Sequence, residues 1–181
     1  MTKKTELWVA GIDPSLAATG VSLSWKDNFT VKSKHAEGDD RLRLLYAKIK
    51  SELIGVDFVV IEDLPVNAKS AGLTGMSQGA VRMALRDLNI PYAKLPPSTL
   101  KKAAIGKGNA SKVDLRKGLE DLEVIGDIDI NIKDDNQVDA LFLRECGRSL
   151  LGYSTLLSMP EALDKYATAP PVVEVLANAE R

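Results

Sequence analysis

Two apolar segments near the start of the chain end in acidic residues. Residues 7–12 read Leu-Trp-Val-Ala-Gly-Ile and are followed by Asp13, and residues 56–61 are apolar at all but one position and are followed by Glu62. Continuous apolar runs of this length are typical of strands that are covered on both faces of a sheet. We therefore predict two central strands, each with an acidic residue at its end.

Further periodicities predict the remaining elements. Residues 20–25 alternate between apolar and polar positions, and the pattern resumes over 29–33 after a turn, as in an antiparallel hairpin. Apolar residues three and four apart indicate helices. The expected elements are helices over 39–54, about 80–88, 98–105, from 109 or 111 to about 122 and 134–151, and a strand over 90–95. This order predicts an α/β fold in which three antiparallel strands precede parallel strands and helices cover the sheet.

One main domain is expected. The 181 residues are 45% hydrophobic and 27% charged, which is enough apolar material for the core of one domain. We place the domain over residues 1–151 and expect 152–181, with its three prolines, to be a loosely organised tail or an extension of the same domain. Residues 66–79 are rich in Ala, Gly, Ser and Asn, and we expect a segment that is mobile or closely approached by another group.

Composition limits the chemistry that is open to this chain. One cysteine, Cys146, and one histidine, His35, exclude an internal disulfide, a cysteine-based zinc cluster and a site with two histidines. No apolar run approaches the roughly 18 to 20 residues of a membrane span, and no secretory signal is recognisable, so we expect a cytoplasmic protein without a membrane partner. Catalysis would therefore depend on carboxylates, hydroxyls and lysines.

The charges are sorted along the chain although the net charge is only −1. Residues 82–117 contain nine Lys or Arg against two acids, whereas residues 118–181 contain five against thirteen. A basic patch beside a carboxylate-rich region suits a polyanion that is held next to a cation site. Two solvated helix faces of opposite sign would give the same counts, so charge alone leaves both readings open.

Three acidic positions are candidates for a metal site: Asp13, Glu62, and Asp135 or Asp139 in the last long helix. Hard divalent cations prefer oxygen ligands, and two ions about 4 Å apart can promote phosphodiester hydrolysis. Positions 135 and 139, like 136 and 139, lie on one helix face. Any one of these acids is more often a turn or cap residue, so only their combination with buried strands favours a site.

These residues resemble the motifs of RuvC-like Holliday-junction resolvases of the RNase H-like superfamily. Gly-Ile-Asp-Pro-Ser at 11–15 with Thr-Gly-Val at 19–21 is similar to the first motif, Val-Val-Ile-Glu at 59–62 to the second, and Val-Asp-Ala-Leu at 138–141 to the last. Gly79, Lys101 and residues 106–112 resemble the basic third region. The similarity extends over about residues 7–150 and implies an RNase H-like mixed sheet with helices on both faces.

The resemblance implies a homodimeric nuclease, bacterial or from a phage, that cuts four-way DNA by paired nicks and uses two Mg²⁺ ions, or Mn²⁺ in their place. Asp13, Glu62 and Asp139 would be its metal-binding carboxylates. The family's fourth acid lies three residues before the last one, where this chain has Asn136 beside Asp135, so either residue is a candidate for the fourth ligand. Residues 64–66, Leu-Pro-Val, replace an aromatic wedge and could act as an apolar one.

The basic block agrees with a DNA partner. Its members would contact backbone phosphates without reading bases; they are Arg82, Arg86, Lys94, Lys101, Lys102, Lys107, Lys112, Arg116 and Lys117. Lys101 and Lys112 match the family's basic positions, and Lys107 lies in the Gly-rich loop between them. Solubility is the plainer explanation for Arg116 and Lys117.

Our leading hypothesis is a structure-selective endonuclease for four-way or other branched DNA. A nuclease for RNA–DNA hybrids or single-stranded branches would use the same acids. A third hypothesis is a catalytically silent junction-binding or replication-accessory protein that has lost its metal site through the change at the fourth position. Met76 and Met83 could adapt to a dimer partner, although we expect them to fill the core.

Overall fold

A five-stranded mixed sheet forms the centre of the computed structural model, which describes residues 6–64, 71–126 and 129–179. The strands are β1 (Val9–Asp13), β2 (Ala18–Ser22), β3 (Asn28–Lys32), β4 (Phe58–Glu62) and β5 (Tyr92–Leu95). They lie in the order β3-β2-β1-β4-β5. The first three strands pair antiparallel, whereas β4 runs parallel to both β1 and β5. The predicted mixed sheet is therefore confirmed.

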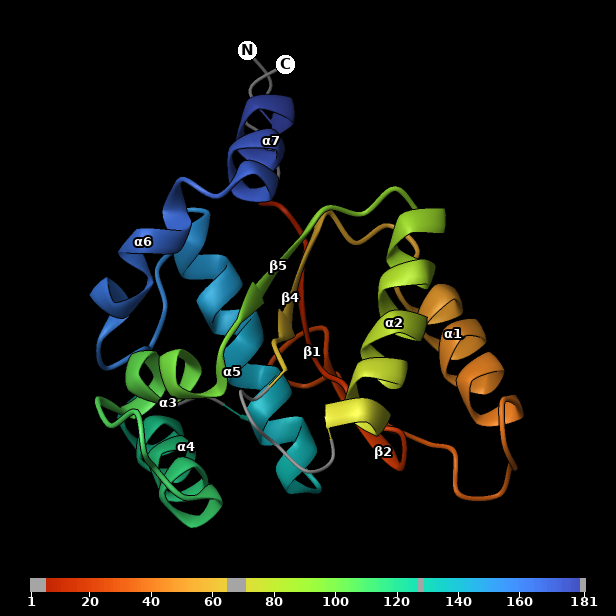
Figure 1. The fold of residues 1–181 in the computed structure, drawn as a ribbon. Coiled ribbons are helices and arrows are strands. Elements are labelled where there is room, and N and C mark those ends of the chain that lie inside the picture. Colours follow the sequence, from red (N-terminus) through yellow and green to blue (C-terminus); the bar gives the residue numbers. More distant parts are fainter. Residues whose placement is uncertain (1–5, 65–70, 127–128, 180–181) are drawn as a thin grey trace.

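Helices cover both faces of this sheet (Figure 1). They are α1 (Asp40–Glu52), α2 (Ala71–Asp87), α3 (Pro97–Ile105), α4 (Lys112–Gly126), α5 (Asp135–Leu150), the 3₁₀ helix η1 (Pro160–Leu163), α6 (Asp164–Ala167) and α7 (Pro170–Ala179). Along β1, alternate side chains enter two cores, because Ala10 and Ile12 pack with α1 and α2 whereas Val9 packs on the opposite face with α3, α4 and α5. This two-sided burial explains why the central strands are apolar at nearly every position.

Helix α5 lies directly on the backbone of β1 and β2. A Cβ atom added at Gly11 would lie 2.0 Å from the carbonyl oxygen of Ala140, and one added at Gly20 would lie 2.0 Å from that of Asn136. Any side chain at these two positions would force the helix away from the sheet. The two glycines thus allow the start of α5 to approach the end of β1.

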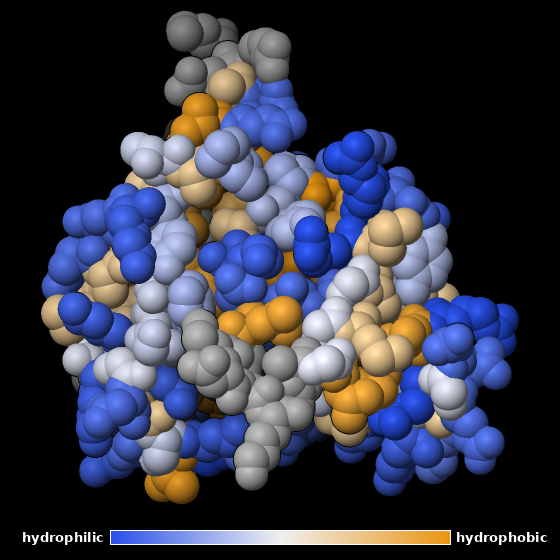
Figure 2. Space-filling view, viewed as in Figure 1, coloured by the Kyte–Doolittle hydropathy of each residue, from blue (hydrophilic) through white to orange (hydrophobic). Residues whose placement is uncertain are grey.

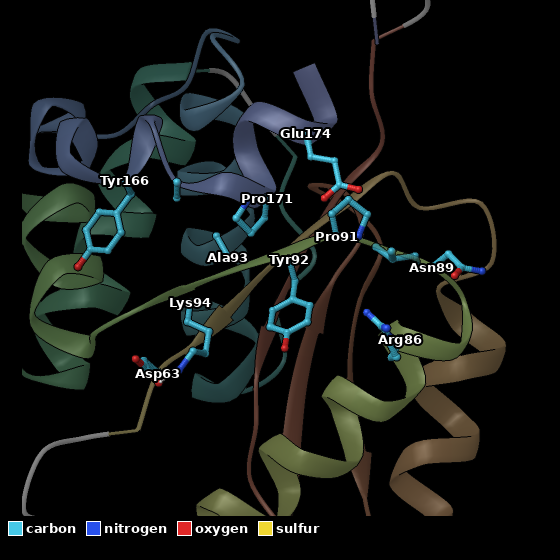
Figure 3. Close-up of a pocket in the computed structure, with 12 residues that line it drawn as sticks. Asp63, Arg86, Asn89, Pro91, Tyr92, Ala93, Lys94, Tyr166, Pro171 and Glu174 are labelled. Atoms are coloured by element: carbon cyan, nitrogen blue, oxygen red, sulfur yellow. Dashed lines mark hydrogen bonds and ion pairs between the residues drawn. The ribbon is translucent and has the colours of Figure 1, made fainter. Parts of the chain in front are cut away.

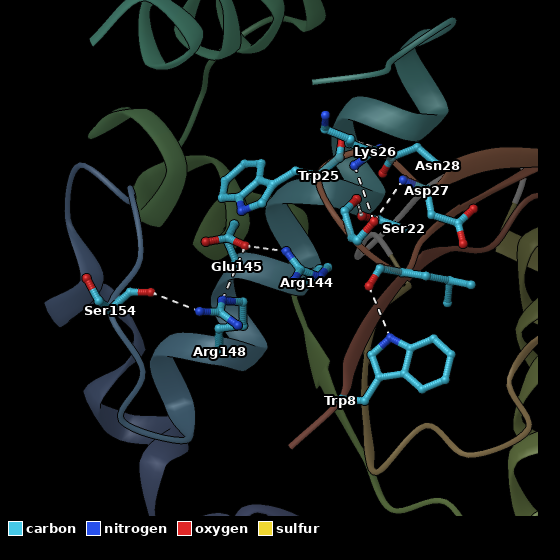
Figure 4. A network of polar contacts seen from close by, with 12 residues as sticks. Trp8, Ser22, Trp25, Lys26, Asp27, Asn28, Arg144, Glu145, Arg148 and Ser154 are labelled. Atoms are coloured by element: carbon cyan, nitrogen blue, oxygen red, sulfur yellow. Dashed lines mark hydrogen bonds and ion pairs between the residues drawn. The ribbon is translucent and has the colours of Figure 1, made fainter. Parts of the chain in front are cut away.

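A buried polar network holds the second half of α5 (Figure 4). The Arg144 guanidinium donates a hydrogen bond of 2.7 Å to Glu145 and lies 5.8 Å from the centre of the Trp25 ring. Arg148 lies 3.6 Å from the same carboxylate and also donates to the carbonyl of Ser154. Burial raises the pKa of Glu145 to about 7 against the opposing influence of the two arginines. The network connects α5 with Trp25, which lies between β2 and β3, and with Ser154 in the segment that follows the helix.

Two segments are more regular than their sequences indicate. Helix α2 begins at Ala71, so residues 71–79 are helical rather than a loop before a helix; residues 66–70 of the same predicted segment lie outside the described residues. After α5, the side chains of Leu157, Leu163 and Val172 are buried in the same core as α3, α4 and α5. Of the two alternatives for residues 152–181, the burial of these apolar side chains favours an extension of the same domain over a loosely organised tail.

Candidate active site

The three predicted acids meet at one edge of the sheet. Strands β1 and β4 are parallel neighbours in which Ile12 lies opposite Ile61, so Asp13 and Glu62, the last residues of the two strands, lie side by side. A side-chain hydrogen bond joins these two carboxyl groups. Asp139 projects from the early part of α5 and is close enough for its charge to act on Glu62.

Burial dominates the electrostatics of these carboxyl groups. Asp13 is 9% exposed and Asp139 is 8% exposed. Burial, together with the charges of Asp13 and Asp139, raises the pKa of Glu62 to about 9, and burial together with the charge of Asp13 raises the pKa of Asp139 to about 7. Burial also raises the pKa of Asp13, although Lys112 opposes the rise. In each case the raised pKa means that the ionised form of the carboxyl group is disfavoured, and a bound cation would offset this cost.

Two lysines of the predicted basic region lie beside the acids. The Nζ atom of Lys112, at the start of α4, is 4.0 Å from Oδ2 of Asp139. The charge of Lys101, in α3, opposes the rise in the pKa values of both Glu62 and Asp139. These two helices therefore place positive charge at the mouth of the acidic site, where a phosphodiester would approach.

The other predicted basic residues lie farther from the acids. Lys107 lies in the loop before α4, and its Nζ atom is 3.9 Å from Oδ2 of Asp114 in that helix. Lys102 is exposed and lines a different depression, together with residues of η1 and α6. Both residues lie between Lys101 and Lys112 along the chain, and neither is among the charges that act on the three acids.

Arg82 and Arg86 belong to another part of the surface. Arg82 donates a hydrogen bond of 2.7 Å to the hydroxyl of Tyr92. Arg86 lines a cavity of about 600 Å³ beside β5, between α2 and the last helices (Figure 3). The same cavity contains the ion pair of Lys94 and Asp63, with an N–O distance of 3.0 Å. Asp13, Glu62 and Asp139 do not line it, so we place the candidate chemistry at these acids and not in this cavity.

The two candidates for the fourth ligand differ in their surroundings. Asp135 accepts two hydrogen bonds from Arg116 of α4, of 3.2 and 2.9 Å. Its charge also contributes to the raised pKa of Asp139. The backbone of Asn136 lies against Gly20 of β2, and Gly20 pairs with Asp13. Asn136 is thus next to the strand that carries the first acid, whereas Asp135 is engaged by α4.

The donor set fits a hard divalent cation. Three carboxyl groups converge, and an excess of buried negative charge is what such an ion would neutralise. Within residues 6–64, 71–126 and 129–179, however, no three Asp, Glu, His or Cys side chains are grouped tightly enough to form a metal site as they lie. Asp13, Glu62 and Asp139 are the residues that would hold such an ion.

Sequence reasoning missed two kinds of supporting residue. The buried Gln78 of α2 donates a hydrogen bond of 2.9 Å to the carbonyl of Glu62 and thereby holds the end of β4. Gly11 and Gly20 permit the close approach of α5. The two glycines belong to the first motif, but their contact with α5 depends on packing that no local pattern reveals.

Residues 64–66 were proposed as an apolar wedge. Leu64 is half-buried, and residues 65 and 66 lie outside the described part of the chain.

Comparison with known proteins gives a consistent result. The family model described as "Crossover junction endodeoxyribonuclease RuvC" matches residues 9–144. Proteins of that name from Chlamydia muridarum and Chlamydia abortus are 30% and 28% identical to this chain over 164 and 162 residues, covering 82% of it and 95% and 98% of their own lengths.

Solved structures support the same fold. Thermus thermophilus RuvC aligns with a TM-score of 0.65 and 21% identity, over 82% of this chain and 99% of that chain. T. thermophilus RuvC in complex with Holliday junction substrate aligns with a TM-score of 0.63 and 22% identity, over 77% and 91%. The RNase H-like architecture expected from the motifs is therefore confirmed.

Proposed function

Because the chain belongs to the RuvC family of crossover junction endodeoxyribonucleases, we propose that it resolves four-way DNA junctions by divalent-metal-dependent hydrolysis of phosphodiester bonds. The observation that carries this proposal is the side-chain contact between Asp13 and Glu62, which are distant in sequence, with Asp139 buried beside them. We also propose that it acts on DNA in the cytoplasm of a bacterial cell or a phage-infected host.

Asp13, Glu62 and Asp139 would hold the metal ions. When bound, two divalent ions supply activation of water and stabilisation of the departing oxyanion. The carboxyl groups are suited to this role because burial keeps bulk water away and makes each unneutralised charge expensive, which favours uptake of a cation. The fourth oxygen would come from Asp135 or Asn136 at the start of α5.

The lysines beside the acids would orient the DNA. Lys101 and Lys112 are the two whose charges act on the buried carboxyl groups, so a phosphate that contacts them is held at the acidic site. Lys107 and Lys102 would bind neighbouring phosphates. Such contacts carry no sequence information, which suits recognition of a branched shape.

A second copy of the chain would pack against α2 to form a homodimer. Leu73, Met76 and Met83 of this helix are 57%, 46% and 58% exposed, so the expectation that the two methionines fill the core is wrong. Figure 2 shows hydrophobic surface over the start of α2. A Cβ atom at Gly72 or Gly79 would meet nothing within 4 Å. Each glycine costs a helix about 1 kcal/mol relative to alanine, so a close approach by a partner helix would explain them.

A junction-cleavage assay tests the proposed activity. Purified protein is incubated with end-labelled four-way DNA in Mg²⁺, in Mn²⁺ and in EDTA. We expect paired nicks with either metal and none in EDTA. Asp13→Asn should bind the junction as the wild type does but fail to cut it. If Asp13→Asn cuts as fast as the wild type, the assignment of the acidic site is wrong.

Competing substrates distinguish the alternatives. Unlabelled RNA–DNA hybrid or single-stranded branches that inhibit more strongly than junctions would favour a different nuclease of the superfamily. The silent-binder hypothesis predicts salt-sensitive junction binding without cleavage in either metal, and calorimetry that detects no uptake of Mn²⁺.

A further inference from the structure

Helices α4 and α5 face each other with two matched charge pairs. Lys112 and Arg116 lie one turn apart on α4, and their partners Asp139 and Asp135 lie one turn apart on α5. The first pair is long, at 4.0 Å, and belongs to the acidic site. The second pair, at 2.9 Å, lies one turn later on α4 and one turn earlier on α5, and Arg116 has no role in the chemistry described so far.

The second pair orients Arg116 more than it stabilises the fold. Both Nε and Nη2 of Arg116 donate to a single oxygen, Oδ1 of Asp135, at 3.2 and 2.9 Å. The two side chains are 40% and 48% exposed, and ion pairs in such positions contribute about 0–1 kcal/mol to stability. A guanidinium has five N–H donors, and these contacts use two of them. Arg116 is therefore held in one orientation with donors left for a further anion.

A shallow groove of about 390 Å³ lies at this position. It is lined by Lys112, Val113, Arg116, Lys117, Glu120, Asp121 and Asp135. The basic residues belong to the first turns of α4, next to the acidic site, and the acids Glu120 and Asp121 follow in later turns. An anion would therefore be attracted to the end of the groove at Lys112 and repelled at the other end.

We propose that Arg116, aimed by Asp135, binds a backbone phosphate of the DNA strand next to the phosphodiester held at Asp13, Glu62 and Asp139. This inference rests on the proposed function, because it needs DNA at the acidic site. It assigns Asp135 to the positioning of Arg116 and leaves Asn136 as the source of the fourth oxygen. The DNA then runs over the first turns of α4 and leaves the helix before Glu120.

The salt dependence of junction binding tests the phosphate contact. Affinity for a fluorescent four-way junction is measured in EDTA, where no cleavage occurs, between 50 and 200 mM salt. Removing one phosphate contact lowers the slope of log K against log salt by about 0.9, so Arg116→Ala should lose about 3.5-fold less affinity across this range than the wild type.

Arg43→Ala is the matched control. Arg43 is also an exposed arginine paired with an aspartate, with an N–O distance of 3.2 Å to Asp40, but it lies on α1. We expect its slope to equal that of the wild type. Equal slopes for Arg116→Ala and Arg43→Ala would overturn the inference. A wild-type protein that binds no junction at any salt would instead refute the proposed function itself.

The variant Asp135→Ala shows whether Asp135 orients the side chain of Arg116 or only neutralises its charge. If Asp135 aims Arg116, the phosphate contact is already lost in Asp135→Ala, and adding Arg116→Ala changes the slope little. If Asp135 only neutralises Arg116, the freed arginine binds phosphate better, and the second substitution lowers the slope by 0.9 or more. The latter result would contradict the positioning role.

Discussion

Three carboxyl groups at the site are partly or fully buried, and ionising them costs free energy. Asp13 and Asp139 are buried and Glu62 is half-buried, and the nearby positive charges come from Lys101 and Lys112. Raised pKa values mean that the folded protein retains protons that the unfolded chain releases. Charge placed in this way reduces stability, so we attribute it to a need to bind cations rather than to a structural role.

The pH dependence of stability follows from these pKa values. The pKa of Glu62 rises from an ordinary 4.5 to about 9, and that of Asp139 from 3.8 to about 7. The folded state therefore binds these protons more tightly than the unfolded state, so the metal-free protein is more stable at low pH and loses this stability as pH rises through the folded-state values. We expect the melting temperature in EDTA to fall between pH 5 and pH 9.

Glu62→Gln should remove much of that loss. The amide keeps the size and a donor for Asp13 but cannot ionise, so the variant should melt about 5 °C above the wild type at pH 9 in EDTA and close to it at pH 5. Mn²⁺ should raise the melting temperature of the wild type more than that of the variant. Parallel melting curves for the two proteins across this pH range would show that Glu62 does not titrate as described.

Helix α5 completes the candidate active site, because it brings Asp139 to the ends of β1 and β4. Its early turns carry Asp135, Asn136 and Asp139, and its distance from β1 and β2 is set by glycines that leave no room for a side chain. A cap also fixes its first turn, because the Asp134 side chain accepts from the backbone of Gln137 and from the Thr30 hydroxyl of β3. Asp139 therefore reaches Asp13 and Glu62 only if the backbone of α5 lies this close to β1 and β2.

Gly20→Ala tests the placement of α5. The added methyl group would lie 2.0 Å from a backbone oxygen, which cannot move aside without the helix. We expect a loss of about 1–3 kcal/mol in the free energy of unfolding, measured by urea denaturation, and weaker Mn²⁺ binding in calorimetry. Unchanged stability and Mn²⁺ affinity would show that the close contact between α5 and β2 does not matter.

Sequence patterns predicted the sheet and its acids because buried strands and their ends have local signatures. Asp13 and Glu62 follow apolar runs, and the parallel pairing of two such strands brings their ends together. The contact of Arg116 with Asp135 depends on how two helices face each other, which no periodicity specifies. The start of α2 at Ala71 was missed because Gly and Ser are weak helix formers, so the composition of residues 71–79 indicated a loop.

Opposite charges are segregated over the whole molecule, and an apolar helix face is left exposed. The basic first turns of α4 and the end of α3 surround the acids, whereas α2 presents Leu73, Met76 and Met83 to solvent on the other face of the sheet. The proposed two-fold assembly through α2 would use a helix on the face of the sheet opposite α4 and α5. It would supply the two active sites needed for the paired nicks that we propose.

Met83→Asp should disrupt the dimer that we propose to form through α2. A carboxylate on this exposed face of α2 would be desolvated on association, so we expect a shift from dimer to monomer in size-exclusion chromatography with light scattering. Ile54→Asp is the control, because Ile54 is 68% exposed but follows α1. A dimer that tolerates Met83→Asp, or a wild type that is monomeric, would argue against this interface.

A crystal structure of the protein with Mn²⁺ would test the metal site most directly. Anomalous scattering locates the ions without reference to any relative. We predict at least one peak in contact with carboxylate oxygens of Asp13, Glu62 and Asp139, with the hydrogen bond between Asp13 and Glu62 replaced by metal ligation. An anomalous map with no peak at these residues, under conditions in which the protein cuts junctions, would contradict the assignment of the active site.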